Sequence, residues 1–241
     1  MTSSWILGGI RTPFARAGTA LERVPAYELG RIAIAELLAR QNLDPARLDH
    51  VVFGNCAQPA EAANIARVAA LLGGVPESVP GVSVHRNCAS GMEAVADATY
   101  RIAAGDAKLV LAGGMESMSQ IPLLYTQAYS DWLEGLMRAK TPLAKFGAFT
   151  RFKAAMLTPR IALAEGLTDL TCGLNMGQTA EVLSREFRIT RAEQDAWALE
   201  SHQRALAARE RLRDEIVPVF PPPALERAPC RRRARAALAC R

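Results

Sequence analysis

Residues 79–112, VPGVSVHRNCASGMEAVADATYRIAAGDAKLVLA, contain the pattern that decides the fold class. The run 79–86 predicts a strand, and apolar residues at helical spacing follow it until Gly105, where the helix is expected to end. The stretch 107–112 is uninterrupted apolar after Lys108, as in a strand that is buried on both faces. This strand–helix–strand succession is typical of parallel sheets in α/β proteins.

The same alternation continues towards the N-terminus. Strands are expected at residues 4–9 and 48–54, and helices at residues 27–40 and 61–72. We therefore expect an α/β core over residues 1–119, with a mixed, mostly parallel sheet flanked by helices.

An insertion is expected over residues 120–222. Its first part, 120–172, carries scattered aromatic residues and prolines and is predicted to be irregular. Regular elements are expected in its second part: helices over 176–187 and 191–211 and a strand over 214–220. Thr190 and Glu193 have the spacing of a capping box at the start of the second helix. The insertion is therefore predicted to be largely helical.

The C-terminal residues 223–241 differ in composition from the rest of the chain. Six of its 29 basic residues are arginines between Arg227 and Arg241, and Glu226 is the only acid from there to the end. The net charge of +5 therefore belongs to this tail, and the remainder is neutral, which argues against a nucleic-acid-binding protein. A basic arm for nucleic acid or membrane is one interpretation of the tail. We favour the other, a stretch read out of frame from GC-rich DNA.

Neither a leader nor a membrane span is indicated. The first residues lack a basic region followed by a long apolar segment, and no apolar run approaches the ~18 residues of a transmembrane helix. The five cysteines are widely spaced and form no CxxC pair, so neither a disulfide framework nor a metal site is expected. A cytoplasmic protein with reduced cysteines and no membrane partner is the natural expectation.

Cys88 is the strongest candidate for a reactive residue. It lies at the predicted strand-to-helix turn, where backbone N–H groups and the helix dipole favour a thiolate and can bind an oxyanion. The small residues 89–91 leave room for a substrate carbonyl. The alternative is that Cys88 only fills a core, as free cysteines often do.

The other candidates are weaker. Cys56 follows a predicted strand and is expected to pack or to line a pocket, and Cys172 is expected to be structural. His85 shares the strand face of Asn87, so no Cys–His pair is assigned to Cys88.

Several segments together resemble the thiolase family. The segment 86–92, RNCASGM, resembles the one that carries the family's catalytic cysteine, and 112–119, AGGMESMS, resembles its GG-x-ESMS segment. Further similar segments follow in the family's order: 175–181 (NMGQTAE), 191–205 (RAEQDAWALESHQRA) and 214–219 (DEIVPV). The opening RTPF at 11–14 also matches. The resemblance covers residues 1 to about 222 and implies the first of two duplicated halves with alternating α and β layers.

The resemblance implies acyl exchange with coenzyme A. Cys88 would carry the acyl group as a thioester, with its backbone N–H contributing to an oxyanion hole. The insertion would cover the pantetheine and adenine of the acyl-CoA, with Met176 near the pantetheine. No permanently bound cofactor or metal is implied, and dimers or tetramers are expected for the family. The alternatives are a ketoacyl-synthase-type condensing enzyme, which shares the fold, and a non-catalytic partner subunit.

Two motifs of the family are not found in the 241 residues. Its second half supplies a histidine in a GHP motif and a second cysteine before a glycine-rich run, and neither motif occurs here. We interpret the sequence as a thiolase interrupted near residues 222–223, and we expect the isolated chain to lack thiolase turnover.

Overall fold

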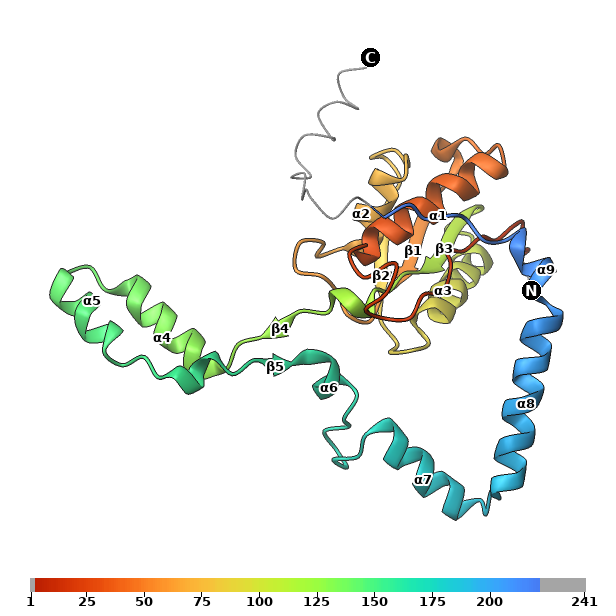
Figure 1. Ribbon diagram of the computed structural model, residues 1–241. Coiled ribbons are helices and arrows are strands. Elements are labelled where there is room, and N and C mark those ends of the chain that lie inside the picture. The colour runs from red at the N-terminus through yellow and green to blue at the C-terminus, as the bar shows by residue number, and fades with distance from the viewer. Residues whose placement is uncertain (1–2, 222–241) are drawn as a thin grey trace. The chain divides into compact units, whose positions relative to one another are not determined.

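The computed structural model describes residues 3–221 of the chain, and the predicted tail over 223–241 lies outside them. The chain divides into two compact units, drawn together in Figure 1. Unit 1 comprises Met1–Gln120 and Glu215–Arg241, and unit 2 comprises Ile121–Asp214. Each unit is described by itself below.

Unit 1 contains a three-stranded parallel sheet. Its strands β1 (His50–Gly54), β2 (Gly81–Val84) and β3 (Val110–Gly114) have the order β2-β1-β3. In the register, Val51 pairs with Gly81 and His50 pairs with Val110. Because the middle strand has neighbours on both edges and helices on both faces, four of its five residues are buried.

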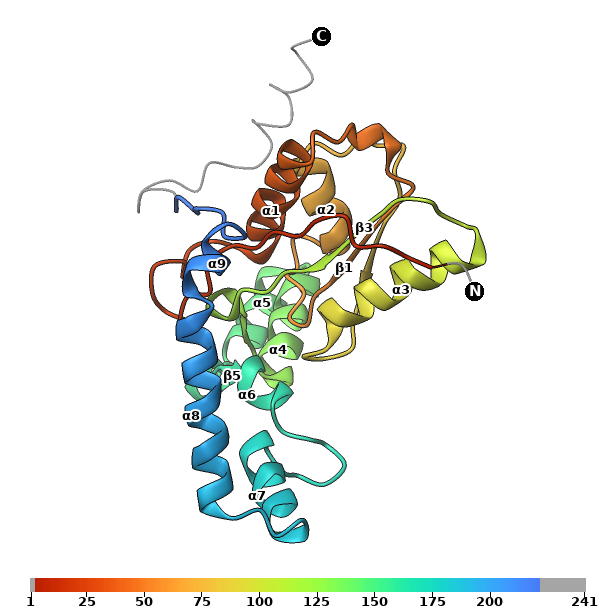
Figure 2. The ribbon, with the colours of Figure 1, turned by 90° about the vertical axis from the view of Figure 1, so that its right-hand side faces the viewer.

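Three helices cover the two faces of this sheet. Helices α1 (Ala26–Arg40) and α2 (Ile65–Leu72) lie on one face, and α3 (Ser90–Ala104) lies on the other (Figure 2). A short 3-10 turn, Pro45–Arg47, precedes β1, and a second, Met118–Gln120, follows β3. The predicted α/β fold with a parallel sheet flanked by helices is confirmed.

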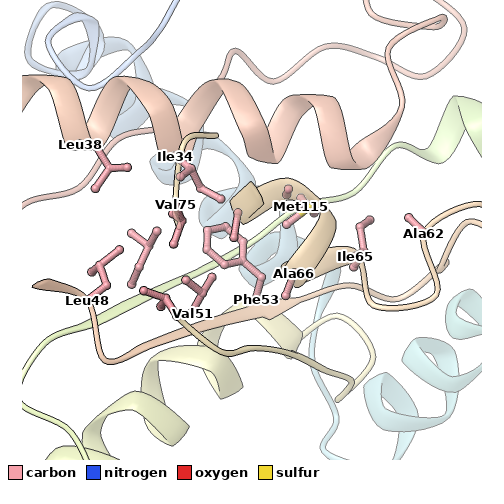
Figure 3. Close-up of a cluster of buried hydrophobic side chains, with 14 of the residues drawn as sticks. Ile34, Leu38, Leu48, Val51, Phe53, Ala62, Ile65, Ala66, Val75 and Met115 are labelled. Carbon is pink, nitrogen blue, oxygen red and sulfur yellow. The ribbon is translucent and has the colours of Figure 1, made fainter. Parts of the chain in front are cut away.

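The main hydrophobic core lies between the sheet and the helices α1 and α2. Successive side chains of a strand point to opposite faces, and Val51 and Phe53 point from β1 into this core, where Ile34 and Ile65 meet them (Figure 3). Val52, between them in sequence, is fully buried but belongs to the opposite face, which α3 covers. Both faces of β1 therefore stabilise unit 1 through apolar burial.

Local polar signals set the ends of these elements. Asn64 caps α2 by accepting a hydrogen bond from the Arg67 amide, and Gly105 ends α3 in the left-handed region at a φ of 82°. The Asp49 carboxylate accepts hydrogen bonds from the amides of Lys108 (2.7 Å) and Leu109 (2.9 Å). These two backbone donors lower the pKa of Asp49 and fix the start of β3 beside β1.

Two predicted strands are wrong. Residues 4–9 form no strand, and the side chains of Trp5, Ile6 and Leu7 are exposed. Residues 214–220 make only an isolated parallel bridge between Ile216 and Arg11. A strand needs a hydrogen-bonded neighbour along its length, and within residues 3–221 the sheet offers none to either segment beyond this bridge.

Unit 2 begins with a helical hairpin, although its first part was expected to be irregular. A two-stranded antiparallel ribbon, β4 (Leu123–Leu124) and β5 (Arg160–Ile161), frames the helices α4 (Gln127–Arg138) and α5 (Pro142–Phe149) and the 3-10 turn Ala154–Leu157. The side chains of Thr126 and Thr141 cap the two helices. Trp132 packs against Phe152, with ring centroids 4.9 Å apart, and donates to the Ala148 carbonyl.

The remaining helices of unit 2 are α6 (Ala162–Gly166), α7 (Met176–Glu186), α8 (Arg191–Ala207) and α9 (Arg209–Arg213). The capping box predicted at Thr190 and Glu193 is present, and a second one joins Asn175 and Gln178 at the start of α7. The predicted helix over 191–211 is interrupted at Ala208, which lies between the end of α8 and the start of α9. No helix among residues 3–221 is long and apolar enough to cross a membrane.

Candidate active site

The candidate site lies where the three parallel strands of unit 1 end. Asn55 and Cys56 follow β1, the segment from His85 to Cys88 follows β2, and Glu116 follows β3. Because the strands are parallel, their carboxyl ends meet at one edge of the sheet, a common place for ligand sites in α/β proteins. The sheet topology therefore collects cysteine, histidine and carboxylate side chains from three distant segments.

Glycines allow the start of α3 to pack directly on these strand ends. A Cβ atom at Gly54 would lie 2.2 Å from the backbone carbon of Ser90 and 2.6 Å from the amide nitrogen of Gly91. A Cβ atom at Gly114 would lie 3.1 Å from the Cα of Gly91. No side chain fits between the strands and the helix, so the residues just before α3 have a fixed position.

Cys88 lies in a tight turn between β2 and α3. Asn87 adopts a positive φ of 46°, which reverses the chain. The Ser90 hydroxyl closes the turn, because it accepts from the Arg86 amide at 2.8 Å and donates to the Asn87 carbonyl at 2.6 Å. Glu93 forms an ion pair with Arg86 across the same turn, at 3.0 Å.

The Cys88 side chain is exposed, two residues before the first residue of α3. A thiol at this position lies close in sequence to the helix N-terminus, and an incoming carbonyl can reach it from solvent. The interpretation of Cys88 as a residue that only fills a core is therefore wrong.

Cys56 lies against the turn that carries Cys88. Its Sγ atom is 2.7 Å from the carbonyl oxygen of Asn87 and 3.7 Å from the Ser90 hydroxyl. Burial raises the pKa of Cys56, the nearby Glu116 carboxylate adds to the effect, and the Ser90 hydrogen bond opposes it. Cys56 was expected to pack or to line a pocket, and its half-buried thiol does pack, against the Cys88 turn itself.

Glu116 ties the ends of β1 and β3 together. Its carboxylate accepts from the amide of Cys56 at 2.7 Å, from the amide of Ala57 at 3.3 Å and from the side chain of Asn55 at 3.1 Å. Asn55 also donates to the Met115 carbonyl at 2.8 Å. Sequence reasoning missed these two residues as site elements. The available signal was that each polar residue lies within two positions of a strand that ends in glycine.

His85 supports the backbone of the site. Its Nε2 atom lies 3.2 Å from the Cys56 carbonyl, and its Nδ1 atom accepts from the Asn87 amide at 3.3 Å. Both ring nitrogens thus contact backbone groups, in agreement with the expectation that His85 does not pair with the Cys88 thiol.

The other predicted site residue, Met176, is the first residue of α7 in unit 2, with 54% of its surface exposed. Cys172 is also exposed and belongs to unit 2. Within residues 3–221 no three His, Cys, Asp or Glu side chains are grouped so that they could hold a metal ion.

Known proteins are similar to this chain in sequence and fold. The 3-ketoacyl-CoA thiolases of Yersinia enterocolitica and Serratia proteamaculans are each 39% identical over 220 residues, which is 90% of this chain and 50% of each relative. A crystal structure of the Bacillus anthracis acetyl-CoA acetyltransferase is similar with a TM-score of 0.74 and 34% identity, again over 90% of this chain and 50% of that one. The chain thus spans about half the length of these relatives.

The protein family described as "Thiolase, N-terminal domain" matches residues 4–225 of this chain. This range includes the strand-to-helix turn of Cys88, the Glu116 segment and both capping boxes of unit 2. The resemblance drawn from the short motifs is therefore confirmed, and the chain belongs to the thiolase family.

Proposed function

We propose that this chain accepts an acyl group from an acyl-CoA thioester on Cys88. The Cys88 thiolate attacks the thioester carbonyl carbon, the tetrahedral intermediate collapses, and coenzyme A leaves as its thiolate, which takes up a proton. The observation that carries this proposal is the exposed thiol on a turn held by Ser90 and Asn87 at the N-terminus of α3. Backbone N–H groups at this helix start are suited to bind the developing oxyanion.

The second half-reaction needs groups that these 241 residues do not contain. In the family, the acyl group passes to coenzyme A or to the α-carbon of a second acyl-CoA, with a GHP histidine and a second cysteine moving the protons. Neither motif occurs in this sequence. We therefore propose that this chain by itself carries out acylation without thiolase turnover.

Three further assignments belong to the same proposal. Unit 2 covers the coenzyme A moiety, with Met176 beside the pantetheine. Self-association as a dimer or tetramer follows from family membership, and a cytoplasmic location suits a site that depends on a reduced thiol.

Acylation is tested by incubating the purified chain with acetyl-CoA and measuring its mass. We expect the addition of one acetyl group, located on the peptide that contains Cys88. The Cys88→Ala variant should lose this adduct, and the matched variant Cys172→Ala should keep it, because Cys172 belongs to unit 2. An adduct of equal yield on Cys172, or none on Cys88, would refute the assignment.

Turnover is tested by cleavage of acetoacetyl-CoA in the presence of coenzyme A. We expect the unmodified chain to show no multiple-turnover cleavage above the rate without protein. Cleavage that depends on Cys88 would show that the two missing motifs are dispensable and would overturn this part of the proposal.

A further inference from the structure

The candidate site contains two thiols, and the proposed acyl transfer uses one of them. The Cys56 Sγ atom lies 2.7 Å from the Asn87 carbonyl oxygen. That oxygen belongs to the peptide that joins Asn87 to Cys88, so the Cα atom of Cys88 lies about 3 Å from it by standard peptide geometry. The two cysteines are therefore neighbours across the carboxyl ends of β1 and β2, although they are distant in sequence.

Both thiols are free in the structure, and they differ in accessibility. Cys88 is exposed to reagents in solution, whereas Cys56 is half-buried under the same turn. An exposed thiol beside a half-buried one is the arrangement in which a first oxidation on the outer sulfur can be resolved by the inner one.

We propose that Cys56 and Cys88 form a dithiol oxidation site, which a hydroperoxide converts into an intrachain disulfide. In the first step the Cys88 thiolate attacks a peroxide oxygen and the O–O bond breaks, which gives Cys88 sulfenic acid and a hydroxide or alkoxide that takes up a proton from solvent to become water or an alcohol. In the second step the Cys56 thiolate attacks the Cys88 sulfur, the S–O bond breaks, and hydroxide leaves to be protonated to water. The peroxide takes up the two electrons that the pair of sulfurs loses.

The surroundings of Cys56 assign it the resolving role. It faces the Glu116 carboxylate after β3, the Ser90 hydroxyl of α3 and the Cys88 thiol after β2, and His85 contacts its carbonyl. Burial and the negative charge of Glu116 raise the pKa of Cys56, so its thiolate is scarce near neutral pH. The disulfide-forming step should therefore accelerate as the pH rises.

Bond formation requires a small local movement. A disulfide needs Cα atoms within about 7 Å, and the Cys56 thiol must leave the Asn87 carbonyl to meet the sulfur of Cys88. The exposed Cys88 side chain would have to rotate about χ1 towards it. The bridged form would have no thiol at position 88, which blocks acylation. That consequence rests on the proposed function, whereas the oxidation itself does not.

The experiment is hydrogen peroxide treatment of the full chain, followed by alkylation, non-reducing trypsin digestion and mass spectrometry. Trypsin cleaves after Arg47, Arg67, Arg86 and Arg101, so the two cysteines fall on the separate peptides 48–67 and 87–101. We expect these two peptides to be the dominant linked pair in the folded chain and to be released by a reductant. In concentrated urea the preference should disappear.

Two serine variants provide the controls. Cys56→Ser should lose the linked pair and shift Cys88 towards sulfinic acid, which a neighbouring thiol otherwise prevents. Cys172→Ser should leave the linked pair unchanged. The proposal is overturned if Cys88 of the unaltered folded chain reaches sulfinic acid without the linkage, or if other cysteine peptides are linked in equal yield. Because no acyl-CoA is present, a failed acylation test leaves this result intact.

Discussion

The two units of this chain reach their structure by different means. Unit 1 buries the strand β1 between three helices, and Val51, Val52 and Ile65 have no accessible surface. In unit 2 no residue between Ile121 and Asp214 is buried. Its helices rely on capping boxes and on ion pairs one turn apart, which are exposed to solvent and contribute little.

The difference fits the proposal that Cys88, in unit 1, is the reactive cysteine. A nucleophile must be held in place to within a fraction of an ångström, and a close-packed support provides this precision. The Cys88 turn rests on strand ends that admit no side chain at Gly54, whereas a Cβ atom at Gly135 of α4 would meet nothing within 4 Å. Unit 2 has equally regular helices, but none of its turns between Ile121 and Asp214 is held against close-packed strand ends as the Cys88 turn is.

The largest difference between the units is expected when one apolar side chain in each is shortened to alanine. Ile65→Ala removes a fully buried side chain of α2 and should lower the free energy of unfolding of unit 1 by about 2–5 kcal/mol. Leu206→Ala in α8 removes a side chain that is 64% exposed and should cost less than about 0.5 kcal/mol. Urea unfolding monitored by circular dichroism measures both. Equal losses would contradict the contrast in burial.

Alanine substitution of one glycine in each unit should change the free energy of unfolding by less, and in opposite directions. Gly54→Ala forces a methyl group onto the Ser90 backbone, so it should destabilise unit 1 by about 1–3 kcal/mol and slow the acylation of Cys88. Gly135→Ala lies in open space within α4 and should stabilise that helix by about 0.5–1 kcal/mol. Unfolding curves and the acetylation rate are the readouts. An unchanged acylation rate in Gly54→Ala would mean that the packing of α3 on the strand end at Gly54 does not position Cys88.

The smallest effects concern pH. The pKa of Asp49 is lowered because its carboxylate accepts from the amides of Lys108 and Leu109, and the pKa of Glu193 is lowered by the amide and hydroxyl of Thr190. A lowered pKa in the folded state means stability that is present above the unfolded pKa and lost as the pH falls through the folded one.

Acidification below about pH 4 should therefore weaken both contacts. Amide hydrogen exchange at Lys108 and Leu109 should report the first, and the helicity of α8 the second. The variants Asp49→Asn and Glu193→Gln should remove the respective acid dependence. A dependence that persists in either variant would assign it to another group.

Much of unit 1 could be predicted from the sequence because its signals are local. Buried parallel strands appear as short apolar runs, and Gly105 marks the end of α3 where it was expected. The strand predicted at residues 4–9 failed because the apolar run has no partner strand among residues 3–221, a fact that the sequence does not contain. The helices α4 and α5 were missed because the scattered aromatic residues and prolines of 120–172 indicated irregular structure, although Thr126 and Thr141 cap both helices.

Some features of the candidate site could likewise be predicted from local sequence, and others could not. The place of Cys88 before a helix followed from the local pattern, and the short family motifs identified the family. The contact between Cys56 and the Asn87 carbonyl and the hydrogen bonds of Glu116 depend on the register of β1 with β2 and β3. That register is set by tertiary packing, so no local pattern reveals which side chains meet.

The bridge between Arg11 and the segment after unit 2 has a consequence for the order of folding. The Arg11 amide donates to Glu215 at 2.9 Å, and the Val217 amide donates to Arg11 at 2.8 Å, which closes a loop of roughly 200 residues. The ladder between His50 and Val110 closes a loop of only about 60 residues. On the ribosome the three strands can therefore assemble while unit 2 is still being synthesised, and the bridge to Arg11 forms last.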